Sequence, residues 1–335
     1  MRRRALLLGV GGMLASPLAW PQASQGARRL IAPINAPEPR DAERVAMRQN
    51  WFDRLAALGW VHGKNLQFQT LYSGGDVPRL RSFISDALRS GVDAILVFST
   101  SGAIEAARAT TTVPIVLAGA SAYPTECGLI KSYARPGTNV TGVAWFQGIE
   151  VNSKLVQFVA DLVPAAKRLA WIVFPDDLVT VSGGEFSPKP YYAKVAYSAG
   201  FDFAYHECRA PDDLDRIFLA LQEWRAHAVI IEPALFSFVA AARIAQLANQ
   251  AGFPTFGGFT RSVVDGGLLG YSPIIRELHN EALPYVDRIF RGAKPSEMPV
   301  VMPNKLELSL NLKTARALGI TIPPRVLLAA DRIIQ

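Results

Sequence analysis

Short apolar runs alternate with amphipathic stretches of helical length along this chain, and the whole pattern occurs twice. Apolar runs bounded by turn residues are typical of buried strands, while the stretches between them have the period of helices that pack on a sheet. Neighbouring parallel strands are joined by such helical crossovers, so the alternation argues against all-helical and all-β folds. The sequence therefore predicts an α/β protein built from two doubly wound parallel sheets.

The first copy of the pattern occupies the N-terminal part of the chain. In residues 40–58, Val45, Trp51, Leu55 and Leu58 fall roughly on one helical face, and a glycine ends the stretch. Strands are expected at 29–33, 66–72, 93–98 and 113–117, with helices at 40–58, 78–89 and 103–109.

The second copy has the same order of elements and a similar size. Two parallel sheets in tandem are typical of a protein with two lobes and a hinge. Strands are expected at 168–174, 201–206, 228–231 and 254–256, with helices at 150–162, 191–199, 211–225 and 237–250.

The boundaries of the lobes are predicted from composition. Residues 123–148, rich in Gly, Pro and Thr, are the expected first crossing between lobes, and the glycine-rich stretch 257–270 is a candidate for the second. Lobe 1 is therefore expected to span 28–120 with a returning segment at about 258–292, and lobe 2 to span 121–257 with the C-terminal segment 293–335.

Residues 1–23 have the pattern of a secretory signal peptide. Three arginines precede an apolar run at 5–20, and this run is shorter than the roughly 20 residues that span a bilayer. The alternative is an uncleaved membrane anchor. No cysteine lies near the end of this leader, so a lipid anchor is not expected, and the mature protein is predicted to be soluble and periplasmic.

Charge and cysteine content favour a small-molecule partner. Three of the 35 basic residues lie in the leader, which leaves 32 against 28 acidic residues, too weak an excess to indicate nucleic-acid binding. Cys127 and Cys208 are expected to be separately buried thiols, with a disulfide as the alternative. The four histidines have no paired spacing, and no nucleotide-binding glycine motif occurs in the mature chain, so neither a metal site nor a cofactor is predicted.

The predicted binding residues follow from the topology. In open parallel sheets, the loops after the strands face a crevice where small molecules bind, and two such lobes enclose a cleft. Hydroxyls and N–H groups near residue 100 suit a carboxylate, and aromatic side chains suit an apolar body. The predicted ligand-binding residues are Asn35, Pro37, Ser99, Thr100, Ser101, Ser121, Tyr123, Trp145, Phe174, Glu232, Phe259 and Tyr271.

No catalytic residue is predicted. The chain lacks a G-x-S-x-G nucleophile motif, and its serines have no base that the sequence identifies. Glu232 and Asp265 are the best acid/base candidates for the alternative of a two-lobe periplasmic enzyme, although a proline follows one and glycines follow the other, which favours ordinary loop roles.

Four segments resemble one known family. They are 58–66 (LGWVHGKNL), 135–142 (RPGTNVTG), 292–300 (GAKPSEMPV) and 311–323 (NLKTARALGITIP). In this order they are similar to the motifs of the ABC-transporter substrate-binding proteins that include tryptophan- and tyrosine-binding members. The resemblance implies the type I periplasmic-binding-protein fold, with two Rossmann-like lobes joined by a hinge. It also implies a small-molecule ligand and an ABC permease in the inner membrane, and a monomer is expected.

The sequence departs from the family at positions expected to face the cleft. Ala122-Tyr123-Pro124 stands where members often have Asp-Pro-Val, and Ala144-Trp145-Phe146 replaces small or acidic residues. The resemblance therefore implies a pocket that is more aromatic and less acidic than usual, and the ligand is left open between an amino acid and an aromatic or carboxylate solute. The function hypothesis is an exported solute receptor, with an enzyme or a ligand sensor for a signalling kinase as alternatives.

Overall fold

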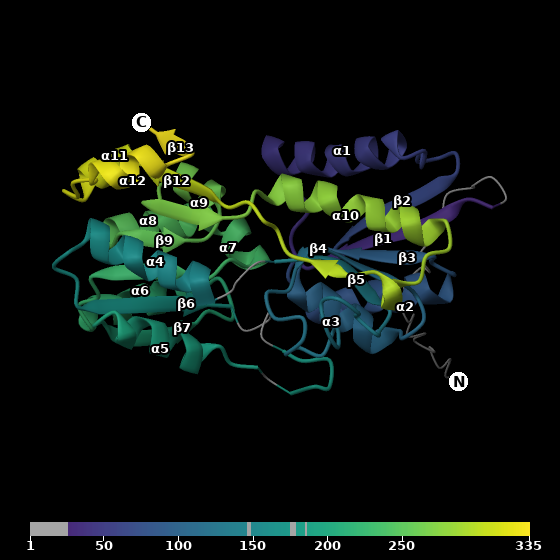
Figure 1. Ribbon diagram of the computed structural model, residues 1–335, viewed down its shortest axis with the longest axis horizontal. Helices are drawn as coiled ribbons and strands as arrows, with labels where there is room; N and C mark the ends of the chain where they lie inside the picture. Colours follow the sequence, from purple (N-terminus) through teal and green to yellow (C-terminus); the bar gives the residue numbers. More distant parts are fainter. Residues whose placement is uncertain (1–25, 146–148, 175–178, 185) are drawn as a thin grey trace, which may run out of the picture.

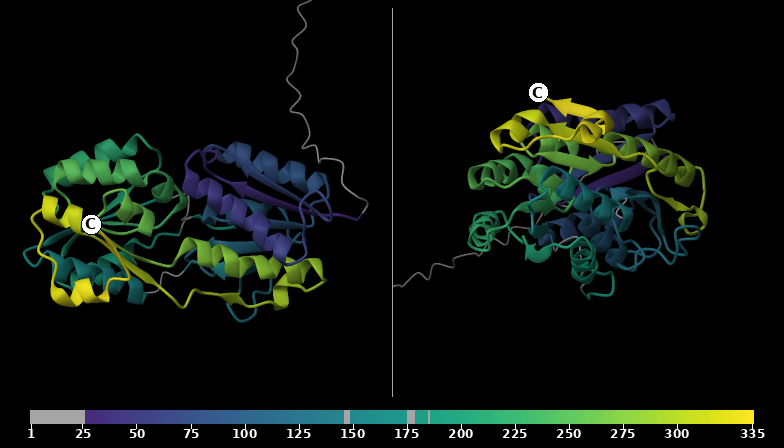
Figure 2. Two further views of the ribbon diagram at one scale, coloured as in Figure 1. Left: turned by 90° about the horizontal axis from the view of Figure 1, so that it is seen from above. Right: turned by 60° about the vertical axis from the view of Figure 1, so that its left-hand side comes forward.

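The structure, a computed structural model, describes residues 26–145, 149–174, 179–184 and 186–335. The signal peptide predicted at 1–23 lies outside these residues. The chain forms two α/β lobes side by side, with α1 and α10 over one sheet and α4 over the other (Figures 1 and 2). This is the predicted fold class.

The first lobe has a parallel sheet with the order β11-β5-β4-β3-β1-β2. Apolar residues of α1 and α10 cover one face, and those of α2 and α3 cover the other. The strands are β1 (Arg28–Ile34), β2 (Leu66–Tyr72), β3 (Ala94–Val97), β4 (Ile115–Ala120), β5 (Val140–Ala144) and β11 (Val300–Val301), and the helices are α1 (Ala42–Ala57), α2 (Val77–Arg89), α3 (Thr100–Ala109) and α10 (Ile275–Phe290).

The second lobe has a sheet with the order β13-β12-β10-β9-β8-β6-β7, in which β10 and β12 form the antiparallel pair. Helices α4, α5, α11 and α12 pack on one face, and α6 and α8 on the other. The strands are β6 (Arg168–Val173), β7 (Asp202–Glu207), β8 (Ala228–Ile231), β9 (Thr255–Gly257), β10 (Leu269–Ser272), β12 (Glu307–Asn311) and β13 (Arg332–Ile334), and the helices are α4 (Ile149–Leu162), α5 (Lys189–Ser198), α6 (Asp213–Glu223), α7 (Leu235–Val239), α8 (Ala241–Ala251), α9 (Thr260–Val264), α11 (Leu312–Ala317) and α12 (Pro324–Ala329).

The crossings between the lobes differ from the predicted boundaries. Strand β5 was expected to be part of a crossing and of lobe 2, yet it pairs with β4 in the first sheet. Strand β10 was expected in the segment returning to lobe 1, yet it pairs with β9 and β12. The short β11 pairs with β5, although 293–335 was expected in lobe 2. The Gly and Pro content of these segments favoured loops over strands, so these short strands were not predicted.

Two helices also differ from their predicted bounds because of local capping. Ser99 accepts a hydrogen bond from the backbone N–H of Gly102, so α3 begins at Thr100 rather than at residue 103. The helix expected at 237–250 is divided at Ala240 into α7 and α8. Helix α7 brings a further turn of apolar side chains to the end of β8.

Neither Cys127 nor Cys208 forms a disulfide, and the two are buried in different lobes. Cys127 lies in the core of the first lobe and Cys208 in that of the second. Burial, together with the nearby Asp213 carboxylate, raises the pKa of the Cys208 thiol to about 12. The prediction of two separate thiols is confirmed.

Within the described ranges, no helix is both long enough and apolar enough to cross a bilayer.

Gly142 provides a test of the packing between β4 and β5. It has φ 116°, and an added Cβ would lie against the Leu117 carbonyl oxygen and 2.7 Å from the Leu117 nitrogen. We expect Gly142→Ala to lower the free energy of unfolding by about 3 kcal/mol, measured by urea denaturation, because the paired strands must move apart. The control Gly74→Ala, which has φ 75° but open space around it, is expected to cost about 1 kcal/mol; equal losses in the two variants would contradict this account.

Candidate functional site

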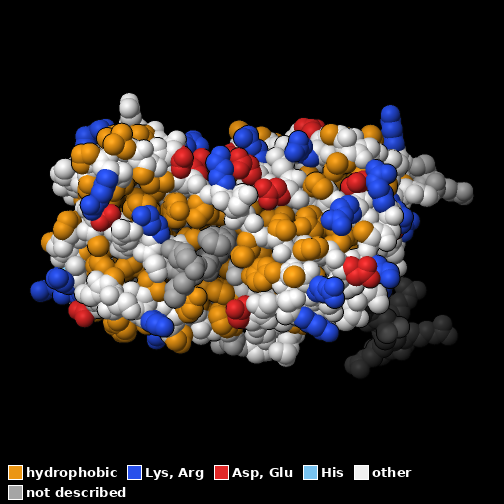
Figure 3. All heavy atoms as spheres, viewed as in Figure 1, with side chains coloured by type: hydrophobic (Ala, Val, Ile, Leu, Met, Phe, Trp, Pro, Cys, Tyr) orange, Lys and Arg blue, Asp and Glu red, His pale blue; other side chains and the backbone are white. Residues whose placement is uncertain are grey.

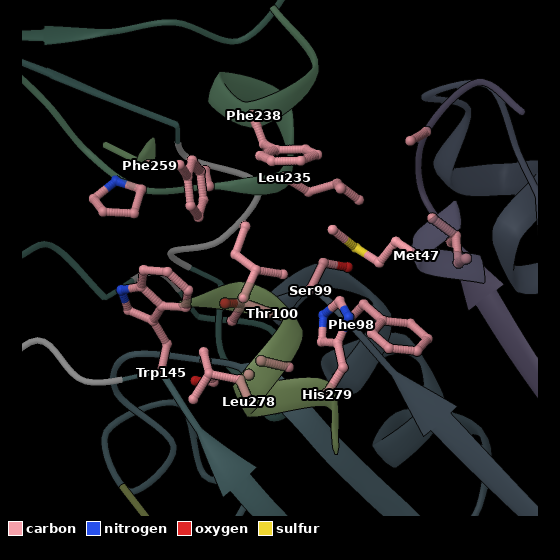
Figure 4. Close-up of a pocket in the computed structure, with 18 of the residues that line it drawn as sticks. Met47, Phe98, Ser99, Thr100, Trp145, Leu235, Phe238, Phe259, Leu278 and His279 are labelled. Atoms are coloured by element: carbon pink, nitrogen blue, oxygen red, sulfur yellow. The ribbon is translucent and has the colours of Figure 1, made fainter. Parts of the chain in front are cut away.

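A cavity of about 120 Å³ lies between the lobes, where the carboxyl ends of both sheets face each other. Figure 4 shows Trp145, Phe98, Ser99, Thr100 and His279 on one side, facing Phe238 and Phe259 on the other. In the first lobe, Phe98, Ser99 and Trp145 follow strands β3 and β5, Thr100 begins α3, and His279 lies on α10. Phe238 and Phe259 come from the second lobe. A ligand in this cavity would therefore touch both lobes.

Nine of the twelve predicted binding residues line the cavity. The rule that placed them, that loops following parallel strands share one edge, holds for strands of both lobes. These nine residues are Pro37, Ser99, Thr100, Ser121, Tyr123, Trp145, Phe174, Glu232 and Phe259.

The other three predicted residues lie outside the cavity lining. The Asn35 side chain accepts a hydrogen bond from the Ser73 hydroxyl at 2.6 Å, and the Ser101 hydroxyl lies 3.2 Å from that of Ser99. Tyr271 on β10 packs against Phe158 of α4, with ring centroids 5.7 Å apart. Because residue 271 was expected in the segment returning to lobe 1, just after the candidate crossing, and not within a strand, its position on the face covered by α4 was not foreseen.

Aromatic rings form two walls of the cavity. Trp51 stacks on Phe98 with centroids 4.1 Å apart and an interplanar angle of 15°. Opposite them, Phe259 contacts both Trp145 and Phe238 edge-on, at 5.2 Å in each case (Figure 4). Phe238 and Phe259 also belong to the hydrophobic cluster of the first lobe, so the lobes are in contact around the cavity.

Polar groups gather at the start of α3 and at the end of β4. Thr100 is the first residue of α3, where backbone N–H groups lack acceptors within the helix. Ser121 has φ 60°, a left-handed conformation that is uncommon for residues other than glycine and that clusters at functional sites. Its hydroxyl is buried without a hydrogen-bond partner among the described residues, although Ser121 lines the cavity. A buried group of this kind is an available contact for a ligand.

His279 is neutral and supplies a donor. Desolvation lowers its pKa to about 3, and its Nδ1 accepts a hydrogen bond from Trp51 Nε1 at 3.1 Å. In the neutral ring the proton is therefore on Nε2. This donor belongs to a side chain that lines the cavity.

Two charged side chains line the cavity in the described part of the chain, Arg44 and Glu232. Arg44 donates from Nε to Asp41 at 2.6 Å. Glu232 accepts from Tyr192 Oη at 2.7 Å and from Trp171 Nε1 at 3.3 Å. Asp265, its predicted partner in the enzyme alternative, instead binds Arg261 at 2.7 Å and does not line the cavity. The structure therefore does not bring these two carboxylates together as an acid/base pair.

An ionic contact joins the lobes beside the cavity. Arg261 of α9 reaches Glu43 at 2.8 Å and Asp41 at 3.4 Å, both at the start of α1. Burial opposes ionisation of Asp41, but the hydrogen bonds from Arg44 and the charges of Arg44 and Arg261 outweigh it and lower its pKa to about 2. Figure 3 shows basic and acidic side chains gathered over this junction.

Hydrogen bonds join the lobes at a second place. Tyr123 of the first lobe lies 3.0 Å from the hydroxyl of Tyr192, which itself donates to Glu232. Burial, with the charge of Glu232, raises the pKa of both tyrosines, so both remain neutral and Tyr123 is the donor to Tyr192. Arg108 of α3 also donates to the Thr180 carbonyl at 2.7 Å.

The sequence analysis missed several lining residues. Met47 and Trp51 come from α1, Leu235 and Phe238 from α7, and His279 from α10. The alternation of strands and helices indicates which loops face the cleft, but it does not indicate which helix residues line the cavity. His279 lies in the segment 258–292 that was expected to return to lobe 1, but no helix was predicted there, so its position on α10 beside the cavity was missed.

Comparisons with known proteins agree with this geometry. Residues 41–334 match the family described as ABC transporter substrate binding protein. A curated tyrosine-binding protein of Clostridioides difficile (strain R20291) is 30% identical over 125 residues, which are 37% of this chain and 35% of that relative, so the match spans about a third of its length.

Two solved structures share the fold over nearly the whole chain. A conserved domain protein from Vibrio cholerae has a TM-score of 0.81 and 24% identity, covering 92% of this chain and 100% of that one. An ABC domain from Streptococcus pneumonia in complex with L-Trp has a TM-score of 0.80 and 20% identity, covering 93% of this chain and 100% of that one. Both support the type I periplasmic-binding-protein fold.

Removing the ionic contact between the lobes should open the molecule. We expect Arg261→Gln without ligand to have a larger radius of gyration by small-angle X-ray scattering, because Asp41 and Glu43 lose their partner on the second lobe. Arg243→Gln is the control, since it removes an exposed pair with Asp215 inside the second lobe. Identical scattering from the two variants would show that Arg261 does not hold the lobes together.

His279 should make stability depend on pH. The pKa of His279 is 6.5 in the unfolded chain and about 3 in the folded chain. Between these two values the unfolded chain binds more protons than the folded chain, so the free energy of unfolding is fully present above pH 6.5 and falls as the pH is lowered toward 3. Between pH 7 and 5 we expect wild type to lose about 2 kcal/mol more unfolding free energy than His279→Gln, measured by urea denaturation. Parallel pH profiles would contradict the buried neutral histidine.

Proposed function

Because the chain belongs to the ABC transporter substrate-binding protein family, we propose that it captures a small solute in the cavity between its lobes and delivers it to a membrane permease. The observation that carries the proposal is the cavity at the facing carboxyl edges, lined by residues of both lobes. A ligand that contacts both lobes stabilises the closed arrangement more than an open one.

The lining favours a solute with an aromatic body and a polar end. The Trp51–Phe98 wall and the Phe259 cluster enclose an apolar body, and Thr100 and Ser121 meet the polar end. The pneumococcal structure holds L-Trp, and the clostridial relative is named a tyrosine-binding protein, so aromatic solutes fit both relatives.

The proposed function includes export to the periplasm and binding to a membrane permease. Residues 1–23 would direct the chain to the periplasm, where a soluble monomer would present the closed, loaded form to an ABC permease in the inner membrane. Cell fractionation tests the location, and loss of uptake of the radiolabelled ligand in a deletion strain tests the transport role. Retained uptake would favour a sensor that binds the solute without transporting it.

The ligand can be identified directly. Protein freshly purified from its source is denatured, and the small molecules released are analysed by mass spectrometry. We expect one compound in near-stoichiometric amount relative to the protein. Calorimetry should show that this compound binds again to the refolded protein, and it should not be converted to a product. Conversion of the compound to a product would support the enzyme alternative instead.

A cavity-filling variant tests the position of the site. Ala122 lines the cavity, so Ala122→Trp is expected to weaken calorimetric binding of the identified ligand by about 100-fold, because the indole occupies the space of the ligand's ring. Ala199→Trp, on an exposed helix end of the second lobe, is the matched control and should bind as wild type does. Unchanged binding by Ala122→Trp would place the site elsewhere.

A further inference from the structure

We propose that His279 is a specificity-determining residue of the cavity: Trp51 fixes its ring so that Nε2–H, together with the Ser121 hydroxyl, binds a carboxylate oxygen of the ligand. This inference rests on the proposed function and names the residues that select the polar end of the solute. A carboxylate is common to amino acids and to simple aromatic acids, so the assignment holds for either class of solute.

The side chain of His279 is held in one orientation. Its Nδ1 accepts a hydrogen bond from Trp51 Nε1 at 3.1 Å, and its ring meets that of Phe98 edge-on, with centroids 4.6 Å apart. Phe98 in turn stacks on Trp51. A neutral imidazole whose Nδ1 is an acceptor carries its proton on Nε2. Trp51 is thus a positioning residue, which leaves Nε2–H as the donor of the ring.

This donor is available to a molecule in the cavity. His279 is 6% exposed and lines the cavity, and in Figure 4 its ring points from α10 toward Ser99. Nε2–H has no acceptor among the residues that the structure describes. Desolvation lowers the pKa of the ring to about 3, so it donates as a neutral group. A buried donor without a protein acceptor is satisfied by an acceptor on a bound molecule.

Ser121 provides a second donor on the same wall. Its hydroxyl is 2% exposed and has no partner in the described chain, and the Trp145 N–H donates to its carbonyl at 3.0 Å, which fixes the turn. Gly119, two residues earlier, lies against α10, because an added Cβ there would be 3.0 Å from Leu278 Cδ1. The turn after β4 and the side chain of His279 are therefore neighbours.

A carboxylate suits these donors best. The first lobe presents a hydroxyl, an imidazole N–H and the N–H groups of the first turn of α3, where Thr100 also lines the cavity. Hydrogen bonds to a carboxylate are about twice as strong as those between neutral groups, and the N-terminus of a helix favours negative charge. Glu232, the acidic lining residue in the described ranges, follows β8 on the second lobe, so a ligand carboxylate is directed to the first lobe.

Pairs of an acid and its alcohol test the inference. Calorimetry compares L-tyrosine with L-tyrosinol, L-tryptophan with L-tryptophanol, and 4-hydroxyphenylpropionate with the corresponding alcohol, so that only the carboxylate changes within a pair. In every pair of which a member binds, we expect the acid to bind at least about 10-fold more tightly. An alcohol that binds as tightly as its acid would overturn the inference and leave the proposed function intact. Binding of no compound would overturn it together with the proposed aromatic solute.

Substitutions at His279 assign the preference to this residue. His279→Phe keeps a ring without a donor, and we expect it to lower the affinity for the acid about 10-fold or more and that for the alcohol about 3-fold or less. His279→Gln keeps an N–H donor and should bind the acid more tightly than His279→Phe does. The control is His206→Phe, on the edge strand β7 and outside the cavity lining, which should bind as wild type does.

Thermal melting confirms that these variants fold. Equal losses for acid and alcohol in His279→Phe would show that His279 only shapes the cavity. An acid affinity no higher in His279→Gln than in His279→Phe would also overturn the assignment.

Ser121→Ala separates binding from stability. A buried hydroxyl without a partner does not stabilise the fold, so the ligand-free variant should melt at the wild-type temperature or above it. Its affinity for the acid should nevertheless fall about 10-fold, and that for the alcohol much less. Wild-type affinity for the acid in this variant would overturn the inference.

The imidazole ring reports the contact directly. In proton–nitrogen correlation spectra, the His279 ring signals, identified by their absence from His279→Gln, should show a proton on Nε2 and none on Nδ1. The acid should move the Nε2–H proton to lower field, and the alcohol should move it less. In Trp51→Phe both tautomers should appear, and the preference for the acid should narrow. An Nε2–H signal that the bound acid leaves unchanged would overturn the inference.

Discussion

The parallel winding of both sheets is the constraint on which the rest of the structure depends. A parallel strand must be followed by a crossover to the opposite end of the sheet, so the loops after the strands gather at one edge. In this protein those edges face each other, which brings Ser99 and Ser121 of one lobe opposite Glu232 and Phe259 of the other. The cavity is thus a consequence of the topology, and its chemistry depends on the side chains that end each strand.

The fold and much of the cavity lining could be predicted from the sequence because both depend on local pattern. Strand β2 was predicted with its observed bounds, and the residues after β3, β4 and β8 were placed correctly at the cleft. Strands β5 and β10 could not be found in this way. Each is short, contains a glycine and lies in a glycine-rich segment, so its pattern resembles that of a turn, although it pairs with the strand before it, β5 with β4 and β10 with β9.

The orientation of individual side chains also could not be predicted from the sequence. Tyr271 was predicted to touch the ligand but packs on α4. Trp51 was assigned to the apolar face of its helix, and it packs in the core of the first lobe while also lining the cavity. The segment with His279 was expected to return to the first lobe, but the helix that it forms, and the side of that helix that lines the cavity, were not predicted. The unusual state of His279, neutral and bonded to Trp51, arises only from burial in the assembled lobe.

The placement of the indole rings has a spectroscopic consequence. Of the six tryptophans, Trp51 and Trp145 line the cavity, and Trp51 is stacked on Phe98 while it donates to His279. A molecule entering between these rings replaces water next to two fluorophores and changes the polarity around them. The intrinsic emission of the protein is thereby a label-free reporter of occupancy, already built into the walls that hold the cargo.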